Sequence, residues 1–356
     1  MHFKDELIAT VQQLTQPGKG LLAADESPGT LKAKFDKISL ETNDENSRLY
    51  RQLLFTTKDL EKYISGVILF RDTVFQKSDD GVNFVELLKS KGIVSGIKLD
   101  EGLTELFPGS EEKYTKGLDT LDKRAAEFYS HGCRFAKWRC VLKVSGNLPS
   151  DLSIRETSYV LARYASICQK NGLVPIVEPE LLTDGSHSID VCAEVSRRIF
   201  SSVFHALSDY NVILEGCLFK PHMISPGSQH SEKKDLAKIA KSTVEVLRDT
   251  IPVSLGGIFF LSGGQGEVEA SQTLHLINVE NSKKGKVWTL SFSFGRALQS
   301  SVVKVWAGKA ENLSKAQETL IARAKANYDA VHGQYDIKAD LEKFTDETLY
   351  VKDYSY

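Results

Sequence analysis

Short apolar runs rich in β-branched residues recur along the chain roughly every 40 residues. Eight runs show this pattern: Gly20–Asp25, Ile64–Phe70, Val94–Leu99, Phe135–Leu142, Val174–Leu181, Val212–Lys220, Gly256–Leu261 and Trp288–Phe294. Near-continuous apolar runs of this length are typical of strands that are buried on both faces, as in a parallel sheet. We therefore predict a strand at each run.

Longer stretches with apolar residues at helical spacing separate these runs. Two clear cases are Asp151–Gln169 and Ile189–Leu207, and the first begins with Ser153 and Glu156 at the spacing of a capping box. Strands that alternate with helices are joined by crossover connections. Eight such units in one undivided chain favour an α/β fold, a single (β/α)8 TIM barrel, over an open doubly wound sheet.

The barrel is expected to occupy residues 1–332 as one domain. The remainder, residues 333–356, is charged and rich in tyrosine and carries no strong periodicity. C-terminal segments of this kind are commonly mobile unless other contacts hold them. We therefore predict a flexible tail that ends in Tyr356.

Charge and composition exclude several classes of partner. Charged residues make up 26% of the chain, and the formal net charge is -2 with both signs well mixed. Such a chain lacks the basic field that binds nucleic acid or an anionic membrane surface. The longest apolar stretches fall far short of the ~18 residues that a membrane span needs, and neither end of the chain resembles a targeting or lipidation signal. We expect a soluble, cytoplasmic protein.

The five cysteines and eight histidines form no recognisable metal or disulfide pattern. The cysteines are odd in number and include no CxxC, so we expect reduced, mostly buried thiols. The histidines are scattered and show no HExxH or other short ligand spacing. The sequence therefore predicts an activity that uses no metal and no cofactor.

Polar residues stand at the end of nearly every predicted strand. In a (β/α)8 barrel the active site forms at the carboxyl ends of the strands, so these residues are the candidates for chemistry. Three pairs spaced i, i+2 share one face of a strand, and three single residues follow other strands: Lys98 with Asp100, Lys137 with Arg139, Glu178 with Glu180, and Asp25, Lys220 and Arg296. They could form ion pairs that only fill the barrel mouth. Apolar side chains would fill that space without the several kcal/mol of hydration that a buried ion loses, so we favour a functional role.

Lys220 is the first candidate for a nucleophile. It ends an apolar run and precedes Pro221, where desolvation and neighbouring cations favour the neutral amine. A neutral amine can form a Schiff base with a ketone, and the iminium then withdraws electrons so that an adjacent carbon–carbon bond breaks. Lys137 is a second candidate, and Lys220 taken alone also fits a lysine that only extends toward solvent.

Glu178 and Glu180 are the candidates for proton transfer. A carboxyl group can carry protons to and from the departing hydroxyl of an intermediate. The alternative is a salt bridge to Lys137, Arg139 or Lys98. We expect one of the two glutamates to form such a bridge.

Two loops are candidates for phosphate binding. Ser262-Gly263-Gly264 and Gly295-Arg296 follow the last two predicted strands. Barrels of this type often bind phosphate there through backbone N–H groups. The glycines permit close approach, and Arg296 adds a planar cation.

With these residues identified, the chain resembles the class I, Schiff-base fructose-1,6-bisphosphate aldolases of eukaryotes over essentially its full length. The resemblance rests on seven segments: Gly18–Ser27, Gly66–Phe70, Phe135–Lys143, Leu161–Pro179, Leu214–Pro221, Phe260–Gln265 and Ser291–Gln299. It implies a lyase of glycolysis and gluconeogenesis that cleaves fructose 1,6-bisphosphate reversibly to dihydroxyacetone phosphate and glyceraldehyde 3-phosphate. It also implies a homotetramer.

The resemblance implies a role for each candidate residue. Lys220 is implied as the Schiff-base lysine and Glu178 as the proton-transferring carboxylate. Asp25, Lys137, Glu180 and the swinging Tyr356 are implied as catalytic companions. The implied substrate- and phosphate-binding residues are Ser27, Lys34, Lys98, Arg139, Ser262, Gly263, Gly295 and Arg296.

Several positions depart from the family pattern. Pro28 stands where threonine is usual, and Ala33-Lys34 replaces a Lys-Arg pair that contributes to phosphate binding. Because Lys34 keeps a charge but lacks a planar guanidinium fork, we expect one phosphate site to be weakened. The other departures are Glu101, His222 and Gly266. Two alternatives therefore stay open: a relative that prefers fructose 1-phosphate or another ketose phosphate, and a scaffold protein with weakened catalysis.

Overall fold

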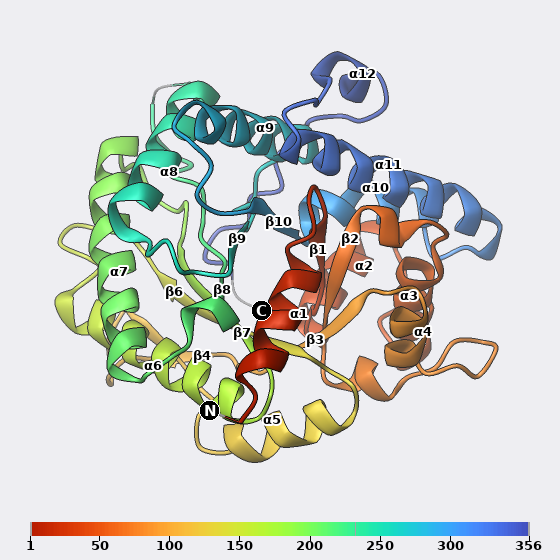
Figure 1. The fold of residues 1–356 in the computed structure, drawn as a ribbon. Helices are drawn as coiled ribbons and strands as arrows, with labels where there is room; N and C mark the ends of the chain where they lie inside the picture. The colour runs from red at the N-terminus through yellow and green to blue at the C-terminus, as the bar shows by residue number, and fades with distance from the viewer. Residues whose placement is uncertain (1, 232, 355–356) are drawn as a thin grey trace.

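The computed structural model describes residues 2–231 and 233–354, and within them eight parallel strands close into a barrel. The strands are β1 (Gly20–Ala24), β2 (Ile64–Leu69), β3 (Val94–Lys98), β6 (Phe135–Leu142), β7 (Val174–Leu181), β8 (Leu218–Phe219), β9 (Gly257–Phe260) and β10 (Leu290–Phe294). Their order around the barrel is β1-β10-β9-β8-β7-β6-β3-β2. Figure 1 looks along the barrel, with the helices around it. The predicted (β/α)8 TIM barrel is confirmed.

The predicted strands agree with the structure except at the sixth run. Only Leu218–Phe219 of Val212–Lys220 pairs as a strand, and Leu214–Gly216 forms a 3-10 turn before it. Glu215 and Gly216 interrupt the apolar run, and the turn packs on the N-terminal helix, where Gly216 lies against Leu7. The prediction of one continuous strand over this run was therefore wrong in length.

Helices cover the outside of the barrel. They are α1 (Lys4–Leu14), α2 (Pro28–Phe35), α3 (Asp44–Thr56), α4 (Phe84–Ser90), α5 (Leu121–Ser130), α6 (Asp151–Lys170), α7 (Ile189–Asp209), α8 (Leu236–Thr250), α9 (Glu267–Lys283), α10 (Arg296–Trp306), α11 (Leu313–Val331) and α12 (Ile337–Leu341). The helices predicted over Asp151–Gln169 and Ile189–Leu207 are confirmed as α6 and α7. The predicted capping box is wrong, because Ser150 caps α6 by accepting a hydrogen bond from the backbone N–H of Ser153.

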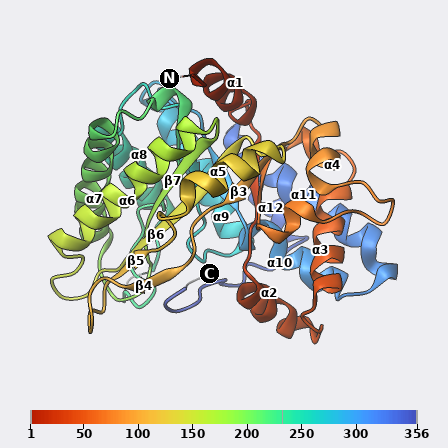
Figure 2. The same cartoon turned by 90° about the horizontal axis from the view of Figure 1, so that it is seen from below.

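The N-terminal helix α1 closes one end of the barrel. Leu7, Val11 and Leu14 are buried in an apolar cluster with side chains from the barrel interior, among them Phe135. Gly96 leaves room for that ring, since a Cβ at Gly96 would lie 2.2 Å from a ring carbon of Phe135. Figure 2 shows α1 at one end of the barrel and the C-terminal chain at the other. The open end of the barrel therefore lies where the strands end.

Elements beyond the eight units frame this open end. A two-stranded antiparallel sheet, β4 (Leu103–Glu105) with β5 (Lys113–Thr115), follows β3. The segments that form β4 and β5 are short and lie among polar residues, so no sequence pattern predicted this sheet. The helix α12 lies inside the predicted tail, and Asp340 of α12 is held 2.5 Å from the guanidinium of Arg323 on α11. Beyond α12, Leu349 donates a backbone hydrogen bond to the carbonyl of Gly264 in the loop after β9.

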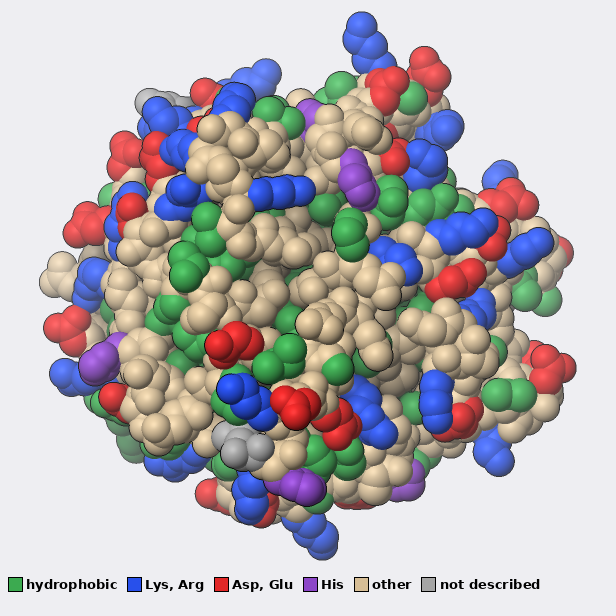
Figure 3. All heavy atoms as spheres, viewed as in Figure 1, with side chains coloured by type: hydrophobic (Ala, Val, Ile, Leu, Met, Phe, Trp, Pro, Cys, Tyr) green, Lys and Arg blue, Asp and Glu red, His purple; other side chains and the backbone are tan. Residues whose placement is uncertain are grey.

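The surface and the thiols agree with the composition. On the face shown in Figure 3, Lys and Arg side chains alternate with Asp and Glu, so that no field of one sign gathers there. All five cysteines are free and buried, which confirms that prediction. Among the described residues, every helix is too short or too polar to cross a lipid bilayer.

Candidate active site

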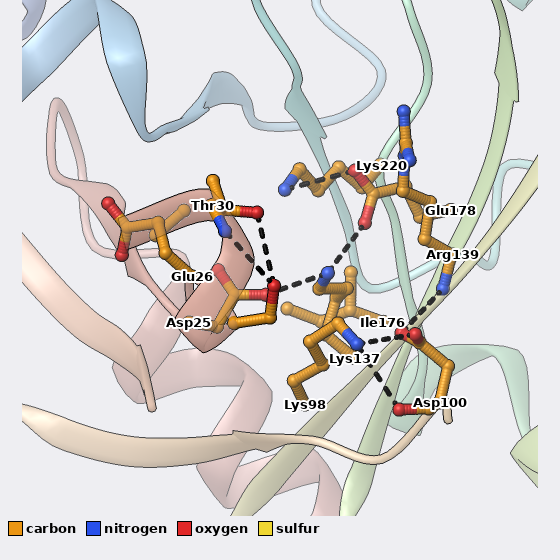
Figure 4. Close-up of polar contacts among 12 residues, drawn as sticks. Asp25, Glu26, Thr30, Lys98, Asp100, Lys137, Arg139, Ile176, Glu178 and Lys220 are labelled. Atoms are coloured by element: carbon orange, nitrogen blue, oxygen red, sulfur yellow. Dashed lines mark hydrogen bonds and ion pairs between the residues drawn. The ribbon is translucent and has the colours of Figure 1, made fainter. Parts of the chain in front are cut away.

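Lys137 lies at the centre of a chain of buried charges across the barrel. Its Nζ is 2.7 Å from Asp25 Oδ2 and 3.5 Å from Glu178 Oε2. Asp25 follows β1, whereas Lys137 and Glu178 lie within the adjacent strands β6 and β7. Figure 4 shows Lys137 between the two carboxylates. The Lys137 side chain therefore compensates two buried carboxylates that would otherwise repel each other.

Lys220 reaches the same carboxylate from the other side. Its Nζ is 3.1 Å from Glu178 Oε1, and both side chains are almost fully buried (Figure 4). The backbone N–H of Lys220 donates to the carbonyl of Val177 at 2.8 Å, so the residue continues the strand pairing of β8 with β7. The backbone thus fixes the root of the amine beside Glu178. At this distance the carboxylate can accept a proton from the amine or return one to it.

Two further ion pairs surround this centre. Lys98 Nζ is 2.6 Å from Asp100 Oδ1, and Arg139 Nε is 2.5 Å from Glu180 Oε2. Burial raises the pKa of Glu180, but Arg139 together with Arg296 and Lys220 holds that pKa below its usual range. Burial likewise raises the pKa of Asp100, but Lys98 and Lys137 together hold that pKa below its usual range. Of the two glutamates, Glu180 thus forms the expected bridge to Arg139, while Glu178 faces both lysines.

The reactive groups open into a cavity of about 500 Å³. Predicted site residues that line it are Asp25, Lys34, Glu178, Glu180, Lys220, Ser262, Gly263, Gly295 and Arg296. Lys137 and Arg139 contact this lining through their ion pairs with Asp25, Glu178 and Glu180, whereas Lys98 pairs with Asp100, which does not line the cavity. The cavity is large enough for a phosphorylated sugar. A substrate carbonyl placed against Lys220 would also meet Glu178.

Backbone and hydroxyl donors surround this cavity. Ser27 is the N-cap of α2, and its Oγ accepts from the backbone N–H of Thr30 at 3.4 Å. Gly295 is the N-cap of α10, and Arg296 is its first residue. The N-terminus of α10 thus lies at one of the predicted phosphate loops, and Thr30 in the first turn of α2 lines the same cavity, although Ser27 does not. Helix N-termini favour anions.

Lys34 lines the cavity, but its ammonium is already occupied. It is hydrogen-bonded to the carboxylate of Glu26, to Tyr50 Oη at 3.1 Å and to Gln299 Oε1 at 3.0 Å. Burial opposes the charge of Glu26, yet Lys34 and Arg51 lower the pKa of Glu26 to about 2. Glu26 is the residue that the sequence analysis missed here. Its only signal was a second carboxylate directly after Asp25 at a strand end.

The C-terminal chain covers part of the cavity. Arg296 donates to the backbone carbonyl of Leu349 at 2.6 Å, and its guanidinium lies 3.9 Å from the ring centre of Tyr354. Arg139 donates to the backbone carbonyl of Tyr354 at 3.0 Å. These contacts were not predicted, because the segment carries no periodicity. Tyr356 lies outside the described residues.

The described residues contain no group of three or more His, Cys, Asp or Glu side chains arranged to hold a metal ion. The arrangement that they do contain combines a buried amine, a carboxylate in contact with it, and anion-binding helix ends. Such a set suits covalent chemistry on the carbonyl of a phosphorylated substrate.

Comparison with known proteins gives a consistent result. The family model "Fructose-bisphosphate aldolase class-I" matches residues 6–356. The chain is 51% identical over 354 residues to fructose-bisphosphate aldolase 6, cytosolic, of Arabidopsis thaliana, covering 99% of this chain and 98% of that protein. It is also 51% identical to fructose-bisphosphate aldolase of Plasmodium falciparum, covering 99% and 95% of the two chains. A solved structure of a Plasmodium falciparum aldolase, in complex with TRAP and a small molecule inhibitor, aligns with a TM-score of 0.92 and 51% identity over 94% of this chain and 96% of that one.

Proposed function

Because the chain belongs to the class-I fructose-bisphosphate aldolase family, we propose a role for each residue of its site. The protein is a fructose-bisphosphate aldolase of glycolysis and gluconeogenesis. It cleaves fructose 1,6-bisphosphate to dihydroxyacetone phosphate and glyceraldehyde 3-phosphate through a lysine Schiff base, and it catalyses the reverse condensation. The roles below derive from the contacts of the site.

Lys220 is the residue that forms the Schiff base. Its neutral amine attacks the C2 ketone of the substrate, and the resulting carbinolamine loses water to give an iminium. The C4 hydroxyl then loses its proton, the C3–C4 bond breaks, and the electron pair of that bond enters the iminium to form an enamine. The observation that carries this assignment is the 3.1 Å contact of Lys220 Nζ with Glu178 Oε1 inside the cavity.

Glu178 is the group that moves protons for Lys220. It lies within reach of the amine, of the oxygen that leaves the carbinolamine and of the nearby hydroxyl groups of a bound ketose. Lys137 contacts both Glu178 and Asp25 and so joins the two carboxylates in one network of charges. Lys137 was the second candidate for the nucleophile. It lies between Asp25 and Glu178, beneath Lys220, so we assign it an electrostatic role.

The remaining predicted residues either bind the substrate or position the groups around it. Arg139 and Lys98 hold Glu180 and Asp100 in place beside the reacting groups. The loops with Ser262-Gly263 and Gly295-Arg296 offer N–H groups and a guanidinium to one phosphate, and Ser27 at the start of α2 offers its hydroxyl to the other.

Tyr356 would assist proton exchange on the enamine from the end of the tail. The barrel, residues 1–332, would act as the catalytic domain and residues 333–356 as its flexible tail.

A second candidate is an enzyme of the same chemistry that prefers fructose 1-phosphate or another ketose phosphate. The observation in its favour is Lys34, whose ammonium is bound by Glu26 and is therefore less available to a second phosphate. A scaffold protein with weakened catalysis is disfavoured, because Asp25, Lys137, Glu178 and Lys220 form a complete and mutually compensated site. We also propose a cytoplasmic location, in line with relatives named cytosolic or cytoplasmic, and assembly as a homotetramer.

A coupled cleavage assay with both ketoses tests this proposal. Fructose 1,6-bisphosphate and fructose 1-phosphate are supplied separately, with a metal chelator present throughout. We expect cleavage of the bisphosphate at a rate that the chelator does not change. A specificity constant that is higher for fructose 1-phosphate would favour the second candidate, and no cleavage of either sugar would contradict the proposal.

A further inference from the structure

The cavity continues past the Schiff-base lysine into a groove between two helical segments. On one side lies α2 with the 3-10 turn Asp36–Ile38 that extends it, and on the other lies α10. The residues that α2 and the turn contribute follow the spacing i, i+3, i+4, i+7, i+8: Thr30, Ala33, Lys34, Lys37 and Ile38. Residues at this spacing share one helical face. Ser300, Val303 and Lys304 form the corresponding face of α10.

The cations that line this cavity differ in what they already bind. Lys34 is held by Glu26, Lys220 by Glu178, and Arg296 by the carbonyl of Leu349. Lys304 is paired with Glu347 of the C-terminal chain at 2.5 Å, but both side chains are more than half exposed. An exposed pair of this kind contributes little free energy and exchanges readily. Within residues 2–231 and 233–354, Lys37 makes neither an ion pair nor a hydrogen bond through its side chain.

Lys37 is placed to supply the charge that its neighbours lack. Ala33 stands one turn before it on the same face, and four-residue spacing puts the two side chains next to each other. Ala33 carries no polar group, so the long Lys37 side chain can extend over it toward the groove. Lys34, the adjacent cation, is committed to Glu26. Among the described lysines that line this groove, Lys37 is therefore the one whose ammonium group is available to bind a dianion.

We propose that Lys37, supported by Lys304, binds the substrate phosphate that lies farther from the Schiff base and thereby determines the preference for a bisphosphate. The inference rests on the proposed function, because it assumes that the ketone is held by Lys220. The phosphate on C6 is separated from the bound C2 by four carbon–carbon bonds, whereas the phosphate on C1 is next to it. Only the C6 phosphate of a bisphosphate can then extend into the groove. Fructose 1-phosphate has no group that would reach Lys37.

The test compares Lys37→Ala with two matched variants. Lys32→Ala removes a lysine from the same helix that is exposed, pairs with Asp36 at 2.8 Å and does not line the cavity. Lys37→Arg keeps the charge. For each variant kcat and KM are measured with fructose 1,6-bisphosphate and with fructose 1-phosphate at fixed ionic strength.

We expect Lys37→Ala to raise KM for the bisphosphate about three- to five-fold, the size of one partly exposed ion pair. The ratio of specificity constants, bisphosphate over monophosphate, should fall by the same factor, and Lys37→Arg should restore it. Lys32→Ala should leave the ratio at the wild-type value. An unchanged ratio in Lys37→Ala, or an equal fall in Lys32→Ala, would overturn the inference. A wild-type protein that cleaves neither sugar would instead contradict the proposed function.

Discussion

Lys220 Nζ lies 3.1 Å from Glu178 Oε1, and both side chains are buried at the carboxyl ends of neighbouring strands. A buried amine and a carboxylate in contact can exchange a proton without help from solvent. A third charge, Lys137, contacts the other oxygen of Glu178. The arrangement therefore provides a nucleophile, a proton carrier and a cation beside the proton carrier.

The first prediction concerns proton transfer by Glu178. Glu178→Gln keeps the size of the side chain and removes its ability to accept a proton. We expect kcat for cleavage to fall by roughly 10²–10⁴-fold, with a much smaller change in KM, because the loss affects steps after binding. Steady-state kinetics checks this, with thermal unfolding to verify that the variant is folded. A kcat within a factor of ten of the wild type would show that another group moves the proton.

The second prediction concerns the charge balance around Lys137. Lys137→Met leaves Asp25 and Glu178 buried and facing each other without a cation between them. We expect loss of activity and a decrease in the free energy of unfolding of about 3–5 kcal/mol. Lys170→Met is the control, because Lys170 forms an exposed pair with Asp122 and should cost at most about 1 kcal/mol. Equal stability losses in the two variants, measured by denaturant unfolding, would rule out this account.

The third prediction concerns competition between the C-terminal chain and a phosphate. The centre of the Tyr354 ring lies 3.9 Å from the Arg296 guanidinium, and both residues line the cavity, so we expect a phosphate that enters beside Arg296 to displace the ring. Tyr354→Ala should therefore lower KM for the bisphosphate about two- to five-fold, the factor that corresponds to one cation–π contact. Tyr354→Phe keeps the ring and should behave as the wild type. If both variants shift KM alike, the ring does not compete for Arg296.

The fourth prediction concerns the pH dependence of stability. His222, which follows β8, is hydrogen-bonded to the last residue of β7. The backbone N–H of Leu181 donates to His222 Nδ1 at 3.2 Å, and Nε2 lies 2.8 Å from Ser196 Oγ. Burial lowers the pKa of His222 from 6.5 to about 4, partly offset by Glu180. The unfolded chain therefore binds the proton more tightly, and stability present above pH 6.5 is lost as the pH falls toward 4, by up to about 3 kcal/mol.

His222→Asn tests this pH dependence, since an amide cannot titrate but can still accept from Leu181. The difference in unfolding free energy between wild type and variant should depend on pH between 7.5 and about 4, with the wild type losing more stability on acidification. Denaturant unfolding at a series of pH values measures it. Parallel pH curves would show that His222 does not titrate in this range.

The barrel and its ion pairs were accessible to sequence reasoning because they follow short-range rules. Apolar runs such as Val174–Leu181 carry their own signal, and charged residues inside such runs, as at Lys137 and Glu178, stand out because burial makes them costly. The spacing i, i+2 was enough to place both members of a pair on one face. The rules did not say which charges would pair across strands.

Features that depend on distant contacts were not predictable in this way. Lys34 is bound by Glu26 and Tyr50, which lie 8 and 16 residues away, and by the distant Gln299, and no periodic pattern in the sequence encodes these contacts. The contact of Tyr354 with Arg296 likewise comes from a segment without periodicity. The N-cap of α6 was predicted wrongly for a different reason. Ser150 and Ser153 are both acceptable caps, and only the backbone geometry distinguishes them.

Borohydride reduction in the presence of fructose 1,6-bisphosphate, followed by peptide mass spectrometry, tests the role of Lys220 most directly. Reduction converts the iminium to a stable secondary amine and so marks the residue that formed it. We predict one adduct, on the peptide that contains Lys220, and none in Lys220→Ala under the same conditions. An adduct on Lys137, or undiminished labelling of Lys220→Ala, would contradict the account.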